Sequence, residues 1–324
     1  MSRWRRIVAG YVGLLALGAM VDGQVLYAQD PVEEKRPRVE LGIGAWISSG
    51  ETKWAHDASS IPGLGNPTSK LTYKDVGTNV VDVVGKFWFT PRVFGRLNVG
   101  IGDIGGGRLI DDDFAAGQRL ISSTTSDIQG NNMWYLNADL GGRVKEFPNH
   151  RGYLEVFAGY QFWHTEHRAV GVGRLVCDST VFNCTAPLPP PGQTVITNTT
   201  NWHSIRVGGS SEYRITRRFS VLGTVAVSPI SIVDNKDIHH LRPDLKQNPS
   251  ISMVGYGFGA DADVGARLMI VKNFYLNVGY RVWWNRTIDG HVTFHDAGGF
   301  SEEFPLAEFQ SLRHGLTFGL NYAF

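Results

Sequence analysis

The chain has 324 residues, 19% of them charged, and a formal net charge of +1 at pH 7. A balanced charge gives no reason to expect nucleic-acid binding, which calls for an excess of Lys and Arg. No stretch after residue 30 is apolar over the roughly 20 residues that a membrane-spanning helix needs. A membrane location would therefore require a closed β-barrel, the other structure that satisfies its backbone in lipid.

The first 28 residues have the pattern of a secretory signal peptide. Three arginines within the first six residues precede the apolar segment 7–21, and Ala28 provides a small residue at a cleavage site. Removing this segment takes away three arginines and one aspartate, which leaves a net charge near −1. We expect residues 29–38 to form a periplasmic tail and residues 39–324 to form one domain.

Apolar and polar residues alternate along that domain with the period of two that is typical of β-strands. At the C-terminus, large apolar residues at every second position from Leu316 to Phe324 alternate with small or polar residues. The combination of this alternation with a terminal aromatic residue predicts the closing strand of an outer-membrane barrel rather than part of a soluble β-sandwich. Ten such segments are present: 39–48, 71–89, 94–109, 132–147, 152–163, 202–215, 219–232, 253–270, 274–287 and 311–324.

The sequence thus predicts an all-β fold, a ten-stranded antiparallel transmembrane β-barrel. Charged residues of both signs occupy the polar faces of the strands, and we expect them to pair across the lumen. Short connections alternate with long ones, and the long ones are 53–70, 114–130, 171–201, 234–252 and 289–310. In the bacterial outer membrane the long loops face the cell exterior, so chemistry is expected among them.

The two cysteines, Cys177 and Cys184, both lie in the long connection 171–201. In an exported protein this proximity predicts a local disulfide, and two cysteines alone do not indicate a metal site. His164 and His167 also resemble metal ligands. On a strand, however, their side chains point to opposite faces, so we expect no metal ion there.

Two acidic clusters lie where strands run into long loops. Asp111 and Asp113 share one face of an extended chain, and Asp237 and His239 do the same in the second cluster. A carboxylate two residues before a histidine can orient the imidazole and leave its other nitrogen to act as a base. Together with the aspartate pair, this dyad can activate water against a peptide carbonyl without a metal ion, a cofactor or a covalent nucleophile.

These clusters resemble the omptins, which are ten-stranded outer-membrane proteases of Gram-negative bacteria. Asp-x-Asp followed by an aromatic residue, and Asp-Asn-x-Asp-x-His, are similar to the two catalytic motifs of that family. Two further segments, 49–53 and 69–74, resemble the family's first two outer strand ends. The resemblance implies an endopeptidase in which Asp237 orients the general base His239. The attacking water would lie between His239 and Asp111, with support from Asp113.

The resemblance also implies that the partners are a polypeptide substrate and lipopolysaccharide. Asp234 matches an acidic residue of the family's specificity pocket for basic side chains. Trp54 stands where omptins carry the second acid of that pocket, so this chain departs from the pattern and substrate preference is open. A non-enzymatic structural or adhesive barrel with a degenerate site is the alternative, and a pore is a weaker one because inward charges would fill the lumen.

Overall fold

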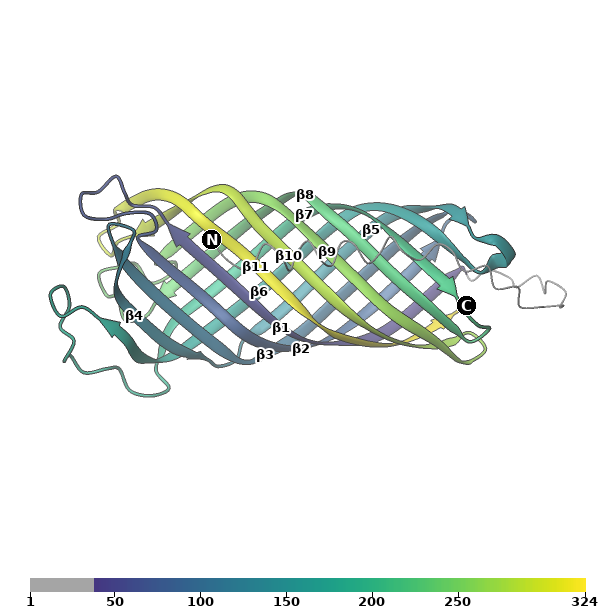
Figure 1. Cartoon of the computed structure of the whole chain (residues 1–324), viewed down its shortest axis with the longest axis horizontal. Helices are drawn as coiled ribbons and strands as arrows, with labels where there is room; N and C mark the ends of the chain where they lie inside the picture. Colours follow the sequence, from purple (N-terminus) through teal and green to yellow (C-terminus); the bar gives the residue numbers. More distant parts are fainter. Residues whose placement is uncertain (1–37) are drawn as a thin grey trace. The chain divides into compact units, whose positions relative to one another are not determined.

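The computed structural model describes residues 38–324 as one antiparallel β-barrel (Figure 1). The signal peptide 1–28 and nearly all of the tail 29–38 lie outside the described residues. Eleven strands form the barrel wall: β1 Val39–His56, β2 Ser69–Trp88, β3 Val93–Ala115, β4 Arg119–Ile128, β5 Asn132–Glu146, β6 Gly152–Cys177, β7 Thr194–Arg214, β8 Phe219–His239, β9 Ile251–Val271, β10 Phe274–His295 and β11 Ser301–Ala323. A single 3₁₀ turn, η2 Pro148–His150, completes the regular structure of residues 38–324.

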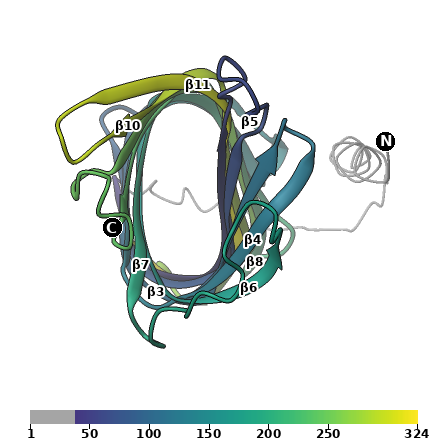
Figure 2. The same ribbon diagram turned by 90° about the vertical axis from the view of Figure 1, so that its left-hand side faces the viewer.

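The sheet closes because β1 pairs with β11 on one side and with β2 on the other. The eleven strands occupy ten positions around the ring. The outer part of β3 pairs with β4 through residues 107–115, and its inner part pairs with β5 through residues 93–103. Both β4 and β5 then pair with β6. Seen end-on, the ring has an oval cross-section (Figure 2).

The prediction of a long loop at residues 114–130 is therefore wrong, because β3 and β4 continue the barrel wall through most of this segment. Residues 119–128 read Arg-Leu-Ile-Ser-Ser-Thr-Thr-Ser-Asp-Ile, which is rich in β-branched residues but lacks apolar alternation. Strands reach further than expected elsewhere too, and β8 continues to His239. Above the lipid, the outward face meets water, so the alternation that marks a lipid-facing strand is lost.

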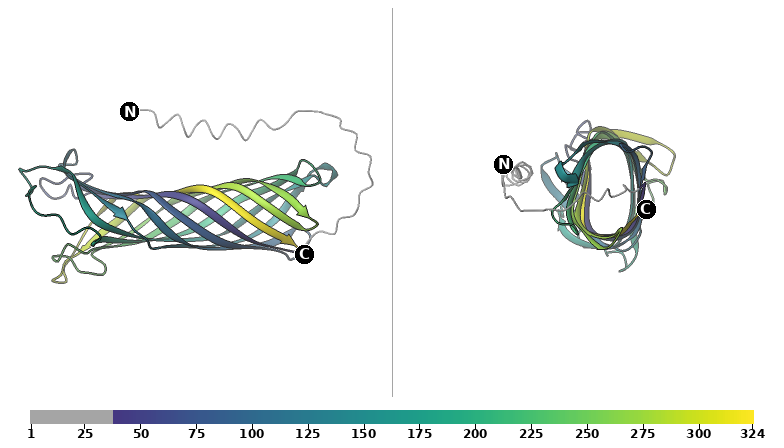
Figure 3. Two further views of the ribbon diagram at one scale, coloured as in Figure 1. Left: turned by 90° about the horizontal axis from the view of Figure 1, so that it is seen from below. Right: turned by 90° about the vertical axis from the view of Figure 1, so that its right-hand side faces the viewer.

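The three longest connections, 57–68, 178–193 and 240–250, all lie at one end of the barrel (Figure 1). At the end we call the loop end, the connections are 57–68, 116–118, 178–193, 240–250 and 296–300. At the turn end they are 89–92, 147–151, 215–218 and 272–273. The C-terminus lies at the turn end, and the strands run at a tilt between the two ends (Figure 3).

Large apolar side chains cover the outer surface of the barrel. On β11, Leu316, Phe318 and Leu320 are each at least 40% exposed, while Asn321 and Ala323 face inward and are buried. An outward apolar band with inward polar residues is the arrangement that lipid requires. Among residues 38–324, no helix has the length and apolar character to cross a membrane.

Ion pairs fill the half of the lumen nearer the turn end, as the sequence predicted. Lys86 on β2 reaches Glu155 on β6 with an Nζ–Oε2 distance of 2.6 Å. Arg281 on β10 contacts Asp82 on β2 at 3.3 Å. Each of these pairs joins strands that lie three positions apart in the ring, so the pairs link non-neighbouring strands through the lumen.

Aromatic rings form a second layer above the ion pairs. Trp46, Tyr135, Trp163 and Trp283 come from four different strands and are all buried. Trp283 lies at the centre of this layer, with ring centroids 4.9 Å from Trp46, 4.7 Å from Tyr135 and 5.7 Å from Trp163. The edge-to-face geometry is the favourable one for aromatic pairs. This layer is the floor above which the loop end opens.

Candidate active site

The aspartate pair lies on the outer part of β3, on the face that points into the barrel. Asp111 is flanked by Leu71 of β2 and Thr124 of β4. Asp113 accepts hydrogen bonds from the Ser69 and Ser122 side chains on the same two neighbouring strands. The wall therefore holds Asp113 by hydrogen bonds, whereas Asp111 lies between one apolar and one polar neighbour.

The Asp–His dyad lies at the end of β8. The Asp237 side chain is fully buried, and its Oδ1 accepts a hydrogen bond from Asn198 Nδ2 on β7. His239 Nε2 lies 3.9 Å from Asp237 Oδ2. This separation is an ion-pair contact and not a hydrogen bond, because both atoms are buried and neither has a hydrogen-bond partner among the described residues. The His239 backbone N–H donates to Ser250 Oγ at 2.9 Å, which fixes the end of the strand.

The two clusters face each other across the lumen. Burial raises the pKa of the Asp111 carboxyl to about 7, the charge of Asp113 adds to the rise, and the nearby His239 opposes it. Asp111 lies outside the lipid-covered part of the wall, because the exposed apolar side chains of β3 end at Ile101. Residues distant in sequence, on β3 and β8, thus share one electrostatic environment.

Three further residues complete this arrangement: Tyr73, His167 and Asn198. The sequence analysis considered only His167 among them, and only as a possible metal ligand. The buried rings of Tyr73 and His167 stack with centroids 5.1 Å apart, although they come from β2 and β6. Burial raises the pKa of Tyr73, and the charges of Asp237 and Asp111 both add to the rise. Tyr73 therefore lies close to both clusters and forms part of the base of the site.

A pattern search could not have found these residues. Asn198 lies within a polar run that has no apolar alternation, and Tyr73 and His167 contact each other only because the ring brings β2 and β6 together.

His164 and His167 point to opposite faces: His164 Nδ1 contacts Asn201 Oδ1 at 2.7 Å, whereas His167 is 1% exposed. Among the described residues, no group of three His, Cys, Asp or Glu side chains could hold a metal ion.

The two residues matched to the specificity pocket occupy different places. Asp234 lies on the opposite face of β8 from Asp237, with its side chain 41% exposed and 4.0 Å from Lys236. The inward position two residues before Asp237 belongs to Asn235, which is fully buried. The structure therefore brings Asp111, Asp113, Asp237 and His239 together but leaves Asp234 outside. Trp54 is 1% exposed and lies in line with Asp111 across β2, where both pair with Leu71.

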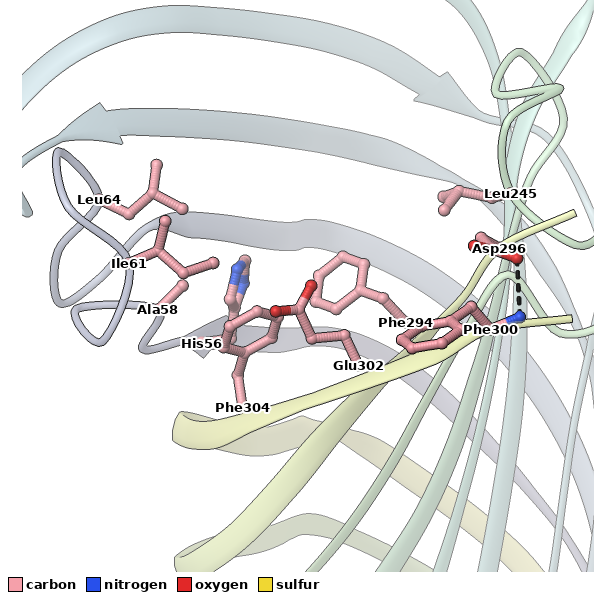
Figure 4. Close-up of a pocket in the computed structure, with 10 residues that line it drawn as sticks. All are labelled: His56, Ala58, Ile61, Leu64, Leu245, Phe294, Asp296, Phe300, Glu302 and Phe304. Carbon is pink, nitrogen blue, oxygen red and sulfur yellow. Dashed lines mark hydrogen bonds between the residues drawn. The ribbon is translucent and has the colours of Figure 1, made fainter. Parts of the chain in front are cut away.

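A cavity of about 350 Å³ opens beside these clusters at the loop end (Figure 4). It lies where the connections 57–68 and 240–250 meet the β10–β11 hairpin. Its walls are mainly hydrocarbon, supplied by Ala58, Ile61, Leu64, Leu245, Phe294 and Phe304. His56, Asp296, Phe300 and Glu302 complete the lining.

The Cys177 and Cys184 side chains form a disulfide at the β6 end of the connection 178–193. Arg174 Nη1 donates to the Cys184 carbonyl oxygen, which ties the loop back to β6. The pairing closes only a short segment of chain at the loop end. It stabilises this connection locally and lies outside the facing clusters.

Comparison with known proteins supports the fold. No family model and no curated protein sequence matches the chain. Among solved structures, the outer-membrane protease OmpT from Escherichia coli is similar with a TM-score of 0.72 and 18% identity, over 88% of this chain and 96% of that one. The autotransporter NalP translocator domain from Neisseria meningitidis gives 0.33 at 10% identity, covering 90% of each chain. The chain thus has the fold of the OmpT outer-membrane β-barrel, in keeping with an outer-membrane location.

Proposed function

We propose that this protein is an omptin-like endopeptidase of the bacterial outer membrane, with its loop end facing the cell exterior. The observation that carries the proposal is the meeting of Asp111 and Asp113 with Asp237 and His239 across one lumen. The barrel similarity to OmpT and the order of the four motifs along the chain support it. Lipopolysaccharide is the lipid partner that the resemblance implies, and assays are best run with it present.

In the proposed reaction, Asp237 orients His239, and His239 removes a proton from a water molecule as that water attacks the peptide carbonyl. The ionised Asp111 accepts the second hydrogen bond of the water, and Asp113 supports it. Collapse of the tetrahedral intermediate then breaks the C–N bond, and the proton held by His239 passes to the leaving amine. Positioned acid–base groups contribute about 10²- to 10⁴-fold each to such reactions.

The test compares cleavage of a peptide library by the wild type and by the Asp111→Asn and His239→Ala variants. Asp112→Asn is a matched control, because the alternation of β3 points Asp112 to the other face and its Oδ1 accepts a hydrogen bond from Ser123 Oγ at 2.6 Å. We expect each site variant to lose at least about 100-fold in kcat/KM and the control to stay within about threefold.

Folding is checked separately by the heat-dependent shift of the barrel on gels. A folded wild type that cleaves no peptide in the library, with lipopolysaccharide present, would refute the endopeptidase. It would favour the alternative, a structural or adhesive barrel whose site has lost its activity.

A further inference from the structure

The apolar cavity beside the facing clusters has the chemistry of a side-chain binding site. Its deeper wall is formed by hydrocarbon side chains, with Ala58 1% exposed and Phe304 8% exposed. His56 belongs to the same wall, and its ring lies 5.0 Å from Phe294 and 5.9 Å from Phe304. Burial lowers the pKa of His56 to about 4, so the ring is neutral at pH 7 and places no charge in the cavity.

Two carboxylates also line the cavity, Asp296 and Glu302. Asp296 and Glu302 are both exposed to solvent, and Asp296 Oδ1 accepts a hydrogen bond from the Phe300 backbone N–H at 2.8 Å. The Phe300 ring, 78% exposed, stands at the tip of the same hairpin (Figure 4). Water surrounds both carboxylates and weakens their attraction for an ammonium group, whereas an apolar side chain would move from water to a hydrocarbon wall.

The cavity is connected to both halves of the candidate active site. His56 and Asp113 both pair with Ser69, so two strand spacings separate them. On the other wall, Phe294 and Asp237 both pair with Ile251. Two strand spacings amount to about 10 Å, and an extended peptide covers this distance in roughly three residues. A polypeptide crossing the site would therefore bring a residue near the scissile bond to the cavity.

We propose that this cavity binds a large apolar side chain, such as Phe or Leu, two to three residues from the bond that is cut. The proposal rests on the proposed function and extends it by naming the substrate class. The volume, about 350 Å³, is at the lower end of ligand pockets and suits one or two side chains rather than a larger molecule. Exposed Asp296 and Glu302 would disfavour acidic residues next to that side chain.

The first experiment measures kcat/KM for peptides that differ at single positions around the cleaved bond. Replacing Phe by Ala at the second or third position is expected to lower kcat/KM about 10- to 100-fold, and replacing it by Asp should lower it further. The Leu64→Glu variant places a carboxylate in the cavity wall and should shift the preference at that position toward Lys. Leu188→Glu is the control, because Leu188 is 44% exposed in the connection 178–193 and does not line the cavity.

A binding experiment separates this proposal from the protease itself. Fluorescence anisotropy with the Asp111→Asn variant measures a labelled Gly/Ala peptide that carries one Phe, against the same peptide with Ala or Lys instead. We expect the Phe peptide to bind at least about 10-fold more tightly, and Leu64→Glu to remove this advantage. Equal binding of all three peptides, or an unchanged preference in Leu64→Glu, would overturn the cavity proposal even if cleavage is confirmed. Selective binding by Asp111→Asn, together with no cleavage of the same peptides by the folded wild type, would overturn the protease alone.

Discussion

At the scale of single residues, Asp111 sets the pH dependence that we expect for cleavage. Its pKa of about 7 means that the carboxyl is protonated below pH 7 and ionised above it, and the cause is mainly burial, with the Asp113 charge second. The proposed mechanism needs the ionised form to accept a hydrogen bond from water. We therefore predict that kcat/KM rises about 10-fold per pH unit below pH 7 and levels off above it.

A pH profile of the wild type measures this limb directly, and thermal unfolding checks its cause. The pKa of Asp111 in the folded protein lies above the ordinary carboxyl value. Asp111 therefore lowers the free energy of unfolding progressively as the pH rises from about 4 to 7. Asp111→Asn should therefore gain stability over the wild type at pH 8 but not at pH 4. A profile that stays flat from pH 5 to pH 8 would argue against Asp111 as the acceptor.

At the scale of elements, the disulfide joins Cys177, the last residue of β6, to Cys184 in the β6–β7 connection. Changing both Cys177 and Cys184 to Ser should leave thermal unfolding of the barrel unchanged, because the ring pairings of β6 do not depend on this loop. The freed connection should be cut faster by chymotrypsin at Phe182 and Leu188, which are 42% and 44% exposed. Digestion followed by mass spectrometry measures the rate, with the reduced wild type as control. Equal rates in the two proteins and in the oxidised wild type would contradict this prediction.

At the scale of the whole molecule, ion pairs in the lumen hold neighbouring and more distant strands together. Glu155 is the anion shared by Lys86 at 2.6 Å and Arg143 at 3.2 Å, and its side chain is 1% exposed. Glu155→Gln leaves two cations without this partner, which is expected to destabilise the barrel by about 3–5 kcal/mol. Lys86→Met should cost less, because Arg143 still pairs with Glu155. Urea unfolding in lipid vesicles measures both variants, and the reverse order would refute this account.

Much of the site follows from local patterns. The alternation of two residues places Asp111 with Asp113, and Asp237 with His239, on single faces of their strands. The same rule puts Asp234 and Asp237 on opposite faces, so motif similarity was the weaker guide for Asp234. The residues below the site, Tyr73 and His167, carry no local signal because their contact joins strands far apart in the sequence.

The amino-acid sequence by itself determined the barrel class, the outward-facing apolar residues and the shared face of each acidic cluster. Lipid and backbone hydrogen bonding impose these features on every strand separately, so each strand records them in its own alternation. Only the tertiary structure decided that β4 and β5 share one position in the ring, that Asp111 meets His239, and that a cavity opens at His56. These features depend on which strands face one another across a closed ring. The residue pattern of a single strand carries no information about its partners on the far side of that ring.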